Sequence, residues 1–421
     1  MKYFFIIFLF CAPTCLFAYL DPGTGSLLLY AVVGSIASLV FAFRNLWYWC
    51  LERIFSGSFQ TKAARLPDIV IHSEGGKYWL VFKPIVEALL AQNRAVAYVS
   101  PDKADPGLEL YADTPLYVPL NPGKELATIS FMNRISAKVV VSTTPNLDVY
   151  MWKRSRNVCR YVHVFHAPTG IDFYEKYSLS FYDDVLTVGP FQDAGIRYLD
   201  ELRDLPRKKL WPVGCTYFDE LIPEVASTHR ANDTFTVLYA PSWGARSSLT
   251  RFGNGVLDAL LSSGVSVIFR PHPQSSVSDA AVLAEALALC SGNPSVRIDR
   301  SRSNVQSLCD ADVMVSDFSG VIADYRCLFG RPVILMDGEQ SAAGYEAEDL
   351  GSFNWDIPSI RSESILCSHP GEIPSLIRSL QESPERYARS APSPLKQSLY
   401  NFGGAGEQAA NALIQILGEC T

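Results

Sequence analysis

The chain has 421 residues and 48% of them are hydrophobic, so it is long enough for two or three domains with buried cores. Its formal net charge of −7 argues against a nucleic-acid-binding protein, which would usually carry a strongly basic face. The 10 cysteines form no CxxC pair, which favours reduced, buried thiols over a disulfide framework or a zinc site.

Residues 1–55 predict a membrane anchor. Two apolar runs, Tyr3–Phe17 and Leu27–Phe43, are separated by a turn-like segment. The first run is either a cleaved secretory signal or one arm of an uncleaved hairpin, and the hairpin is slightly favoured. Arg44 and the aromatic residues after it are typical of a membrane interface on the cytoplasmic side. The sequence therefore predicts a protein of the cell inner membrane whose remaining residues face the cytoplasm.

From about residue 66, short apolar runs alternate with amphipathic segments. Strands are predicted at Asp68–His72, Ala95–Val99, Lys138–Ser142 and Arg160–Phe165, and a helix at Leu80–Leu90. This alternation predicts a parallel sheet with helices on both faces. The last of these strands delivers His166 at its carboxyl end, where open α/β sheets bind their ligands.

The same alternation restarts after Pro223–Asp233, a polar segment that resembles a linker. Strands are predicted at Phe235–Ala240, Val265–Phe269, Val313–Val315 and Pro332–Met336, and helices at Gly255–Ser262 and Asn411–Leu417. The sequence thus predicts an α/β protein with two Rossmann-like domains, 66–225 and 234–421, that face a cleft.

The segment Ala311–Asp337 reads as strand, serine-rich turn, helix and strand. Gly330 is a helix stop signal, and Pro332 follows shortly after it. The start of this helix, next to Ser316 and Ser319, is either a phosphate site or a plain capping turn, because serine and aspartate also cap ordinary helices. The local pattern leaves both interpretations open.

Four predicted strand ends carry residues suited to phosphate chemistry. These are His166, the segment Tyr239–Arg246, Arg270 with His272, and the segment Ser316–Gly320. Together they offer a base, cationic phosphate ligands and a helix start. The sequence has no Gly-x-x-x-x-Gly-Lys loop and no clear acidic metal cluster, so neither a kinase-like nucleotidase nor a metal site is predicted.

In combination and order, these motifs resemble the CDP-glycerol glycerophosphotransferases, which include the teichoic acid glycerol phosphate polymerases. The matching motifs are Tyr239–Trp243, Arg270–Pro273 and Ser316–Ser319, followed by Asp324–Tyr325 and Arg331–Pro332. The resemblance implies a glycosyltransferase-B fold, with an acceptor domain first and a CDP-donor domain second. It also implies a CDP-linked polyol donor and membrane-associated work on cell-surface polymers.

The resemblance also implies residue roles. The catalytic residues that the resemblance implies are His166, as general base for the acceptor, and His272. The donor-binding residues that it implies are Arg270, Ser316, Asp317, Ser319, Ser242 and Arg246. Two positions depart from the family pattern: Ala167 replaces a glycine, and its methyl group would crowd a close backbone approach. Gly320 replaces a serine and removes one hydroxyl ligand.

The implied reaction transfers glycerol phosphate, or another polyol phosphate, from CDP-glycerol or a related CDP-polyol to a hydroxyl group. The acceptor would be a membrane-linked glycan or polyol-phosphate chain, and CMP would be released. No cofactor, no metal and no nucleic-acid partner are expected, and the oligomeric state is left open. Two alternatives remain: a glycosyltransferase of the same fold that uses a nucleotide-sugar, and a non-catalytic membrane-anchored relative.

Overall fold

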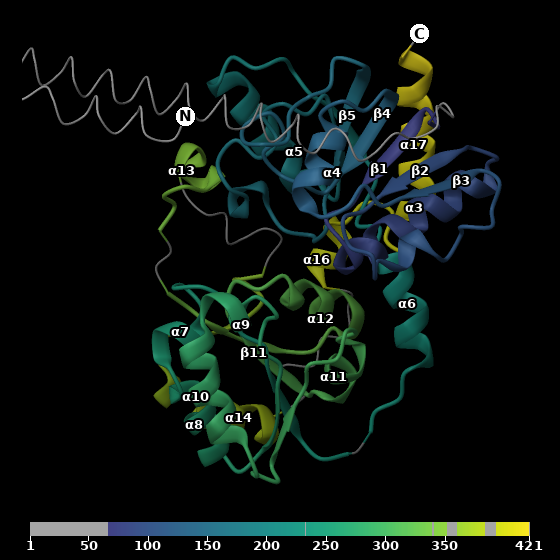
Figure 1. Cartoon of the computed structure of the whole chain (residues 1–421). Coiled ribbons are helices and arrows are strands. Elements are labelled where there is room, and N and C mark those ends of the chain that lie inside the picture. The colour runs from purple at the N-terminus through teal and green to yellow at the C-terminus, as the bar shows by residue number, and fades with distance from the viewer. Residues whose placement is uncertain (1–65, 232, 339–340, 352–359, 384–392, 421) are drawn as a thin grey trace, which may run out of the picture. The chain divides into compact units, whose positions relative to one another are not determined.

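The computed structural model describes residues 66–231, 233–338, 341–351, 360–383 and 393–420 (Figure 1). The predicted membrane anchor, residues 1–55, lies outside the described residues. Within the described ranges, no helix is both long enough and apolar enough to cross a bilayer. All described residues belong to one unit of the chain, Ala63–Thr421.

The first sheet has seven strands, all parallel, in the order β3-β2-β1-β4-β5-β6-β7. The order reverses between β1 and β4, so the switch point of this sheet lies between those two strands. The strands are β1 Ile69–His72, β2 Val96–Val99, β3 Tyr117–Leu120, β4 Ala137–Ser142, β5 Val158–Val164, β6 Asp184–Thr187 and β7 Lys209–Pro212.

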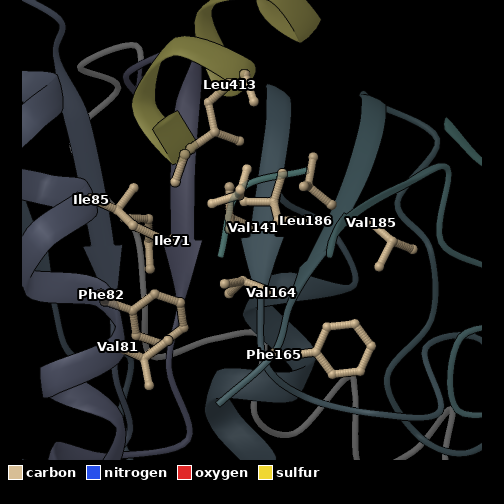
Figure 2. Packing of buried hydrophobic residues seen from close by; sticks show 14 of the residues in the cluster. Ile71, Val81, Phe82, Ile85, Val141, Val164, Phe165, Val185, Leu186 and Leu413 are labelled. Atoms are coloured by element: carbon tan, nitrogen blue, oxygen red, sulfur yellow. The ribbon is translucent and has the colours of Figure 1, made fainter. Parts of the chain in front are cut away.

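Helices bury their apolar stripes on this sheet because its central strands are hydrophobic on both faces. Every residue of β1 is buried, as expected for a strand of a covered parallel sheet. Phe82 and Ile85 of α3 lie beside Ile71 of β1, and Leu413 of α17 lies near the same strands (Figure 2). The helices of this domain are α3 Trp79–Ala91, α4 Glu125–Met132, α5 Pro190–Leu202 and α6 Phe218–Ser227.

The second sheet has six parallel strands in the order β10-β9-β8-β11-β12-β13, with its switch point between β8 and β11. The strands are β8 Thr236–Tyr239, β9 Ser266–Phe269, β10 Val296–Ile298, β11 Val313–Ser316, β12 Val333–Met336 and β13 Ile365–Cys367. The helices are α7 Ser248–Phe252, α8 Gly255–Ser262, α9 Ser275–Ser278, α10 Ala280–Cys290, α11 Val305–Asp310, α12 Val321–Phe329, α13 Glu346–Leu350 and α14 Ile373–Glu382.

The segment Ala311–Asp337 folds as its sequence predicts. Strand β11 leads through a short turn into α12, and β12 follows. Gly330 ends α12 with φ of 64°, a left-handed conformation that glycine adopts without steric cost. The predicted α/β class with parallel sheets is therefore confirmed.

The C-terminal segment corrects the predicted domain boundary of 234–421. Helix α17 (Ala405–Glu419) packs against α3 and β4 of the first domain, whereas α16 (Pro394–Ser398) contacts α12 of the second. Asp219 caps α17 by accepting hydrogen bonds from the backbone amides of Ala405 and Gly406 at 3.2 and 2.7 Å. A Cβ atom on Gly406 would lie 2.5 Å from the Pro84 side chain, so only glycine permits this close helix contact.

Two further expectations are corrected. Helix α6 runs to Ser227, so the segment Pro223–Asp233 is helical where it begins rather than a linker throughout. Cys159 and Cys420 form a disulfide between β5 and the end of α17, with Cα atoms 6.0 Å apart, so the expectation of reduced, buried thiols is wrong for this pair. The other described cysteines are buried and free.

Candidate active site

Asp317 joins the two loops at the switch point of the second sheet. Its carboxylate accepts hydrogen bonds from the backbone amides of Ser242 and Ser248, at 2.9 and 2.7 Å, and from the Ser248 hydroxyl at 2.8 Å. Burial raises the pKa of Asp317, while these hydrogen bonds act in the opposite direction. Because both carboxylate oxygens already have protein donors, Asp317 and Ser242 hold the loop geometry.

Ser316 and Ser319 occupy different environments although they lie in one turn. Ser316 is fully buried, and its hydroxyl donates to the carbonyl of Ala240 at 2.6 Å. Ser319 is half-buried at the start of α12, where it lines a small cavity with Phe318 and Thr169. Of the two predicted phosphate ligands, Ser319 is the one whose side chain borders open space.

Arg270 is held by an ion pair. Its guanidinium contacts the Asp299 carboxylate at 2.6 Å and donates to the carbonyl of Ser301 at 2.9 Å. Burial acts against ionisation of Asp299, but hydrogen bonds from Ser301 and Ser307 and the charge of Arg270 outweigh it and lower its pKa to about 2. Arg270 therefore fixes the loop that follows β10, which also carries Arg302.

His272 lies beside an aromatic surface. Its ring is 6.1 Å from the ring of Trp243, which is 44% exposed. Its Nδ1 accepts a hydrogen bond from the Gln274 amide at 3.1 Å, so the neutral ring carries its proton on Nε2. Burial and the charge of Lys77 lower the pKa of His272, although Asp279 opposes them. A neutral His272 offers one N–H donor to a ligand.

Arg246, the remaining predicted donor ligand, stacks on two aromatic rings. Its guanidinium carbon lies 5.1 Å from the centre of the Phe318 ring and 4.2 Å from the centre of the Tyr345 ring. Phe318 lines the same small cavity as Ser319. Arg246 thus places a positive charge close to the turn that begins α12.

His166 follows β5 at the carboxyl edge of the first sheet. Its ring packs edge-on against Tyr78, with ring centres 5.4 Å apart, and lies 6.2 Å from Tyr174. Desolvation by the surrounding chain and the positive charge of Lys77 lower the pKa of His166, although the side chain is exposed on its outer side. The imidazole is therefore neutral at pH 7 and has a free lone pair for a proton.

Lys77 is the residue that connects the two histidines, and the sequence analysis did not identify it. Its ammonium group lies 4.7 Å from the centre of the Tyr78 ring. The same positive charge lowers the pKa of both His166 and His272, which come from different sheets. The ammonium group of Lys77 therefore lies within electrostatic range of each of the two histidines.

The loop that carries Lys77 is built on glycines. Gly75 has φ of 138°, which side chains rarely tolerate, and the carbonyl of Gly76 accepts a hydrogen bond of 2.7 Å from Arg302. Burial and the nearby carboxylate of Glu74 raise the pKa of the Tyr78 hydroxyl. The one signal in the sequence was the Gly-Gly-Lys run directly after the first strand.

Ala167 and Gly320, the two departures from the family pattern, face each other. A Cβ atom built on Gly320 would lie 3.7 Å from the Cβ atom of Ala167, which is ordinary van der Waals contact. The methyl group of Ala167 thus occupies space next to the position where the family carries a serine. The turn after β5 and the start of α12 are neighbours at this site.

The assembled groups suit chemistry on a phosphate ester. They comprise a neutral imidazole at His166, an N–H donor at His272, the ammonium group of Lys77 and the hydroxyl of Ser319 at a helix start. Within the described part of the chain, no cluster of three His, Cys, Asp or Glu side chains is arranged to hold a metal ion. That no metal is needed stays a prediction.

Comparison with known proteins agrees with the motifs. Residues 221–361 match the model of the CDP-glycerol:poly(glycerophosphate) glycerophosphotransferase family. These residues include the Arg270–Pro273 and Ser316–Ser319 motifs, whereas His166 lies outside the match. No curated protein sequence matches the chain.

Several solved structures share the fold at low sequence identity. The wall teichoic acid polymerase TagF with CDPG is 14% identical, with a TM-score of 0.54 over 92% of this chain and 98% of that one. MnaA of S. aureus with UDP is 12% identical, with a TM-score of 0.55 over 84% and 97%. The UDP-GlcNAc 2-epimerase of Methanocaldococcus jannaschii, in complex with UDP-GlcNAc and UDP, is 14% identical, with a TM-score of 0.52 over 82% and 99%.

These structural similarities confirm the predicted two-sheet α/β fold. A shared fold does not identify the substrate of this protein. The family match is independent of them and falls on the loops that carry the motifs. Residues 221–361 therefore match the glycerophosphotransferase family model, and the resemblance predicted from the motifs is confirmed for this part of the chain.

Proposed function

We propose that this protein transfers glycerol phosphate from CDP-glycerol to a hydroxyl group of a cell-surface polymer and releases CMP. The observation that carries the proposal is the match of residues 221–361 to the glycerophosphotransferase model, which includes the Arg270–Pro273 and Ser316–Ser319 motifs. Two histidines, His166 and His272, and the ammonium group of Lys77 supply the chemistry that such a transfer needs. The first histidine comes from the sheet whose loops include Lys77, and the second from the segment that matches the glycerophosphotransferase model.

The protonation states of His166, His272 and Lys77 suit the steps of this reaction. The acceptor oxygen attacks the phosphorus atom that carries glycerol, and its proton passes to the neutral imidazole of His166. The bond from that phosphorus to the bridging oxygen breaks, and its electron pair leaves with CMP. Lys77 and the Nε2–H of His272 stabilise the negative charge that develops on the diphosphate. Ser319 and the start of α12 bind a phosphate oxygen.

Release of CMP by the purified full-length protein tests the reaction directly. We expect turnover with CDP-glycerol and none with a UDP-sugar, and CDP-ribitol tests whether another polyol is accepted. Replacement of the proposed base, His166→Ala, should lower turnover by roughly 10²–10⁴-fold and leave donor binding nearly unchanged. A normal thermal melt with normal turnover in this variant would remove His166 from the mechanism, and His272 would become the candidate base.

The pH profile provides a second readout of the same assignment. Because the pKa of His166 is lowered, its neutral and basic form persists below the usual histidine range near 6.5. We expect kcat/KM with CDP-glycerol to stay flat from pH 8 to about pH 6 and to fall only at lower pH. An acidic limb centred above pH 6.5 would show that a group other than His166 sets the protonation requirement.

We also propose that residues 1–55 anchor the protein in the cell inner membrane, with the two sheets in the cytoplasm. The apolar runs and the aromatic and arginine residues from Arg44 to Arg53 support this topology. A reporter fused after Phe59 should behave as cytoplasmic, and periplasmic activity of that fusion would contradict the topology. The acceptor would then be a glycan or polyol-phosphate chain linked to the membrane.

A further inference from the structure

A second cavity lies at the switch point of the first sheet. Its volume is about 290 Å³, and it lies where β1 ends at His72 and where Thr144 follows β4. Open α/β sheets bind ligands at such points. Of the residues that line this cavity, the donor chemistry above uses only Lys77. The cavity is lined by His72, Glu74, Lys77, Pro101, Glu125, Thr128, Ile129, Thr144 and Trp152.

His72 is a buried polar side chain in this lining. It is only 5% exposed, and its Nδ1 is 3.2 Å from the hydroxyl of Ser142. That hydroxyl donates towards the His72 carbonyl and the Thr144 hydroxyl, at 2.9 and 3.0 Å, so it accepts a hydrogen bond from the Nδ1–H of His72. Nε2 is then an acceptor, and burial, which lowers the pKa to about 4, keeps the ring neutral.

The other lining groups favour an uncharged ligand rich in hydroxyl groups. Glu74 and Glu125 are carboxylates and accept hydrogen bonds, as does Nε2 of His72, whereas Lys77 is the one cation of the lining. The lining therefore carries a formal charge of −1, which disfavours an anion inside it. Trp152 adds a flat apolar ring, 4.8 Å from the ring of His72.

We propose that this cavity binds the acceptor by its uncharged, hydroxyl-bearing end, which is a polyol or sugar unit. The assignment rests on the proposed transferase function. The cavity borders the reaction centre through Lys77, whose ammonium lies 4.7 Å from the Tyr78 ring, and that ring lies 5.4 Å from His166. Because Lys77 lines the cavity, an acceptor bound here lies next to the residue that connects the cavity to Tyr78 and His166.

Glu125 provides the sharpest variant because it is exposed in the first turn of α4, where a substitution does not disturb the core. Glu125→Gln keeps the shape and removes a charged acceptor. The probe is a water-soluble glycerol phosphate trimer with a free hydroxyl end, and its binding to the full-length protein is measured by calorimetry without donor. We expect about tenfold weaker binding, as for loss of a hydrogen bond to a charged group.

Three controls separate the cavity from general effects. Glu109→Gln removes an exposed carboxylate of the same domain that is not part of the cavity lining, and it should leave binding of the trimer unchanged. The same trimer capped with a terminal phosphate should bind at least tenfold more weakly, because two negative charges would face Glu74 and Glu125. Binding of CDP-glycerol should be equal in all variants.

Ile129→Trp fills the cavity without touching a charge and gives an independent test. Provided that its thermal melt is normal, it should raise the KM for the trimer at least tenfold and leave the KM for CDP-glycerol unchanged. If the trimer binds in a manner that depends on Glu125 but no CMP is released, the cavity assignment stands and the proposed reaction fails.

If CMP is released while the trimer binds and reacts equally well in both variants, the cavity assignment fails and the reaction stands. Failure of the trimer to bind the unmodified protein at all would overturn the assignment for this class of acceptor. Equal binding of the free and the capped trimer would overturn the claim that the cavity selects an uncharged end.

Discussion

Ala167 and Gly320 illustrate what single residues contribute to this site. In the sequence they are two separate losses, one of space and one of a hydroxyl ligand. In the structure they form one contact, with 3.7 Å between the Ala167 Cβ and the position of a Cβ on Gly320. The two differences therefore compensate each other sterically. This relation links residues 153 positions apart (320 − 167), which no local pattern reveals.

The pair predicts a coupled response to substitution. Gly320 has ordinary helical dihedral angles, so the backbone accepts serine there, but the added side chain must then share space with the methyl group of Ala167. We expect Gly320→Ser alone to lower kcat/KM and the double change with Ala167→Gly to recover it. The coupling energy should be about 0.5–2 kcal/mol, measured by CMP release for the four proteins. Additive effects would show that the two residues act independently.

The cations of the site show what sequence patterns do not specify at the same scale. The predicted donor-binding cations are Arg270 and Arg246, and in the structure Arg270 is paired with Asp299 at 2.6 Å. Lys77, in the loop after β1, is the cation within range of both histidines. Arg270 pairs with Asp299, which follows β10. Spacing in the sequence does not specify such a distant partner.

At the scale of elements, apolar runs located the central strands well. The structure has strands at Ile69–His72, Val313–Ser316 and Val333–Met336, within one or two residues of the predicted limits. The strands that the pattern did not identify lie towards the sheet edges. For example, β7 at Lys209–Pro212 has no fully buried residue, and so it lacks the continuous apolar run of a central strand.

The contact between α12 and Tyr217, the residue before α6, supports a prediction about pH. Asp324 of α12 is 8% exposed and accepts hydrogen bonds from the Tyr217 hydroxyl and, at 3.2 Å, from Asn304. Burial raises its pKa from 3.8 to about 6, against the effect of these bonds. A raised carboxyl pKa means that the folded state binds the proton more tightly, so the stability contributed by Asp324 falls as pH rises from about 4 to 6.

Comparison with Asp324→Asn isolates this contribution because asparagine resembles the protonated acid and does not titrate. The free energy of unfolding of the unmodified protein, minus that of the variant, should be larger at pH 4.5 than at pH 7.5 by about 2 kcal/mol. Urea unfolding at the two pH values measures it. A difference that does not depend on pH would show that Asp324 is ionised throughout this range.

At the scale of the whole molecule, the alternation of strands and helices predicted two domains but not how the chain is shared between them. Helix α17 returns to the first sheet, and α13, which follows β12 of the second sheet, contacts the first domain. Both segments are amphipathic or polar in sequence, and such patterns indicate that a face is buried without indicating against which sheet. Only the tertiary structure shows which sheet each of these helices packs against.

The docking of α13 depends on a buried charge cluster. Arg203, at the end of α5, contacts the carboxylates of Glu346 and Asp349, the latter at 2.8 Å. Glu346 is 1% exposed, and its other oxygen accepts a hydrogen bond of 3.0 Å from the Ser178 amide. Burial raises the pKa of Glu346, and Arg203 acts against that rise. Without Arg203 the carboxylate would remain buried with no opposite charge bonded to it.

We therefore expect Arg203→Ala to destabilise the protein by about 3–5 kcal/mol, the usual cost of removing one partner of a buried ion pair. The matched control is Lys176→Ala, which removes a pair of 2.7 Å to the same Asp349 where both side chains are partly exposed, and which should cost less than about 1 kcal/mol. Urea unfolding at pH 7 measures both. Equal, small losses would mean that Glu346 takes up a proton when Arg203 is absent. In that case the loss in Arg203→Ala should grow at higher pH, where keeping that proton becomes more costly.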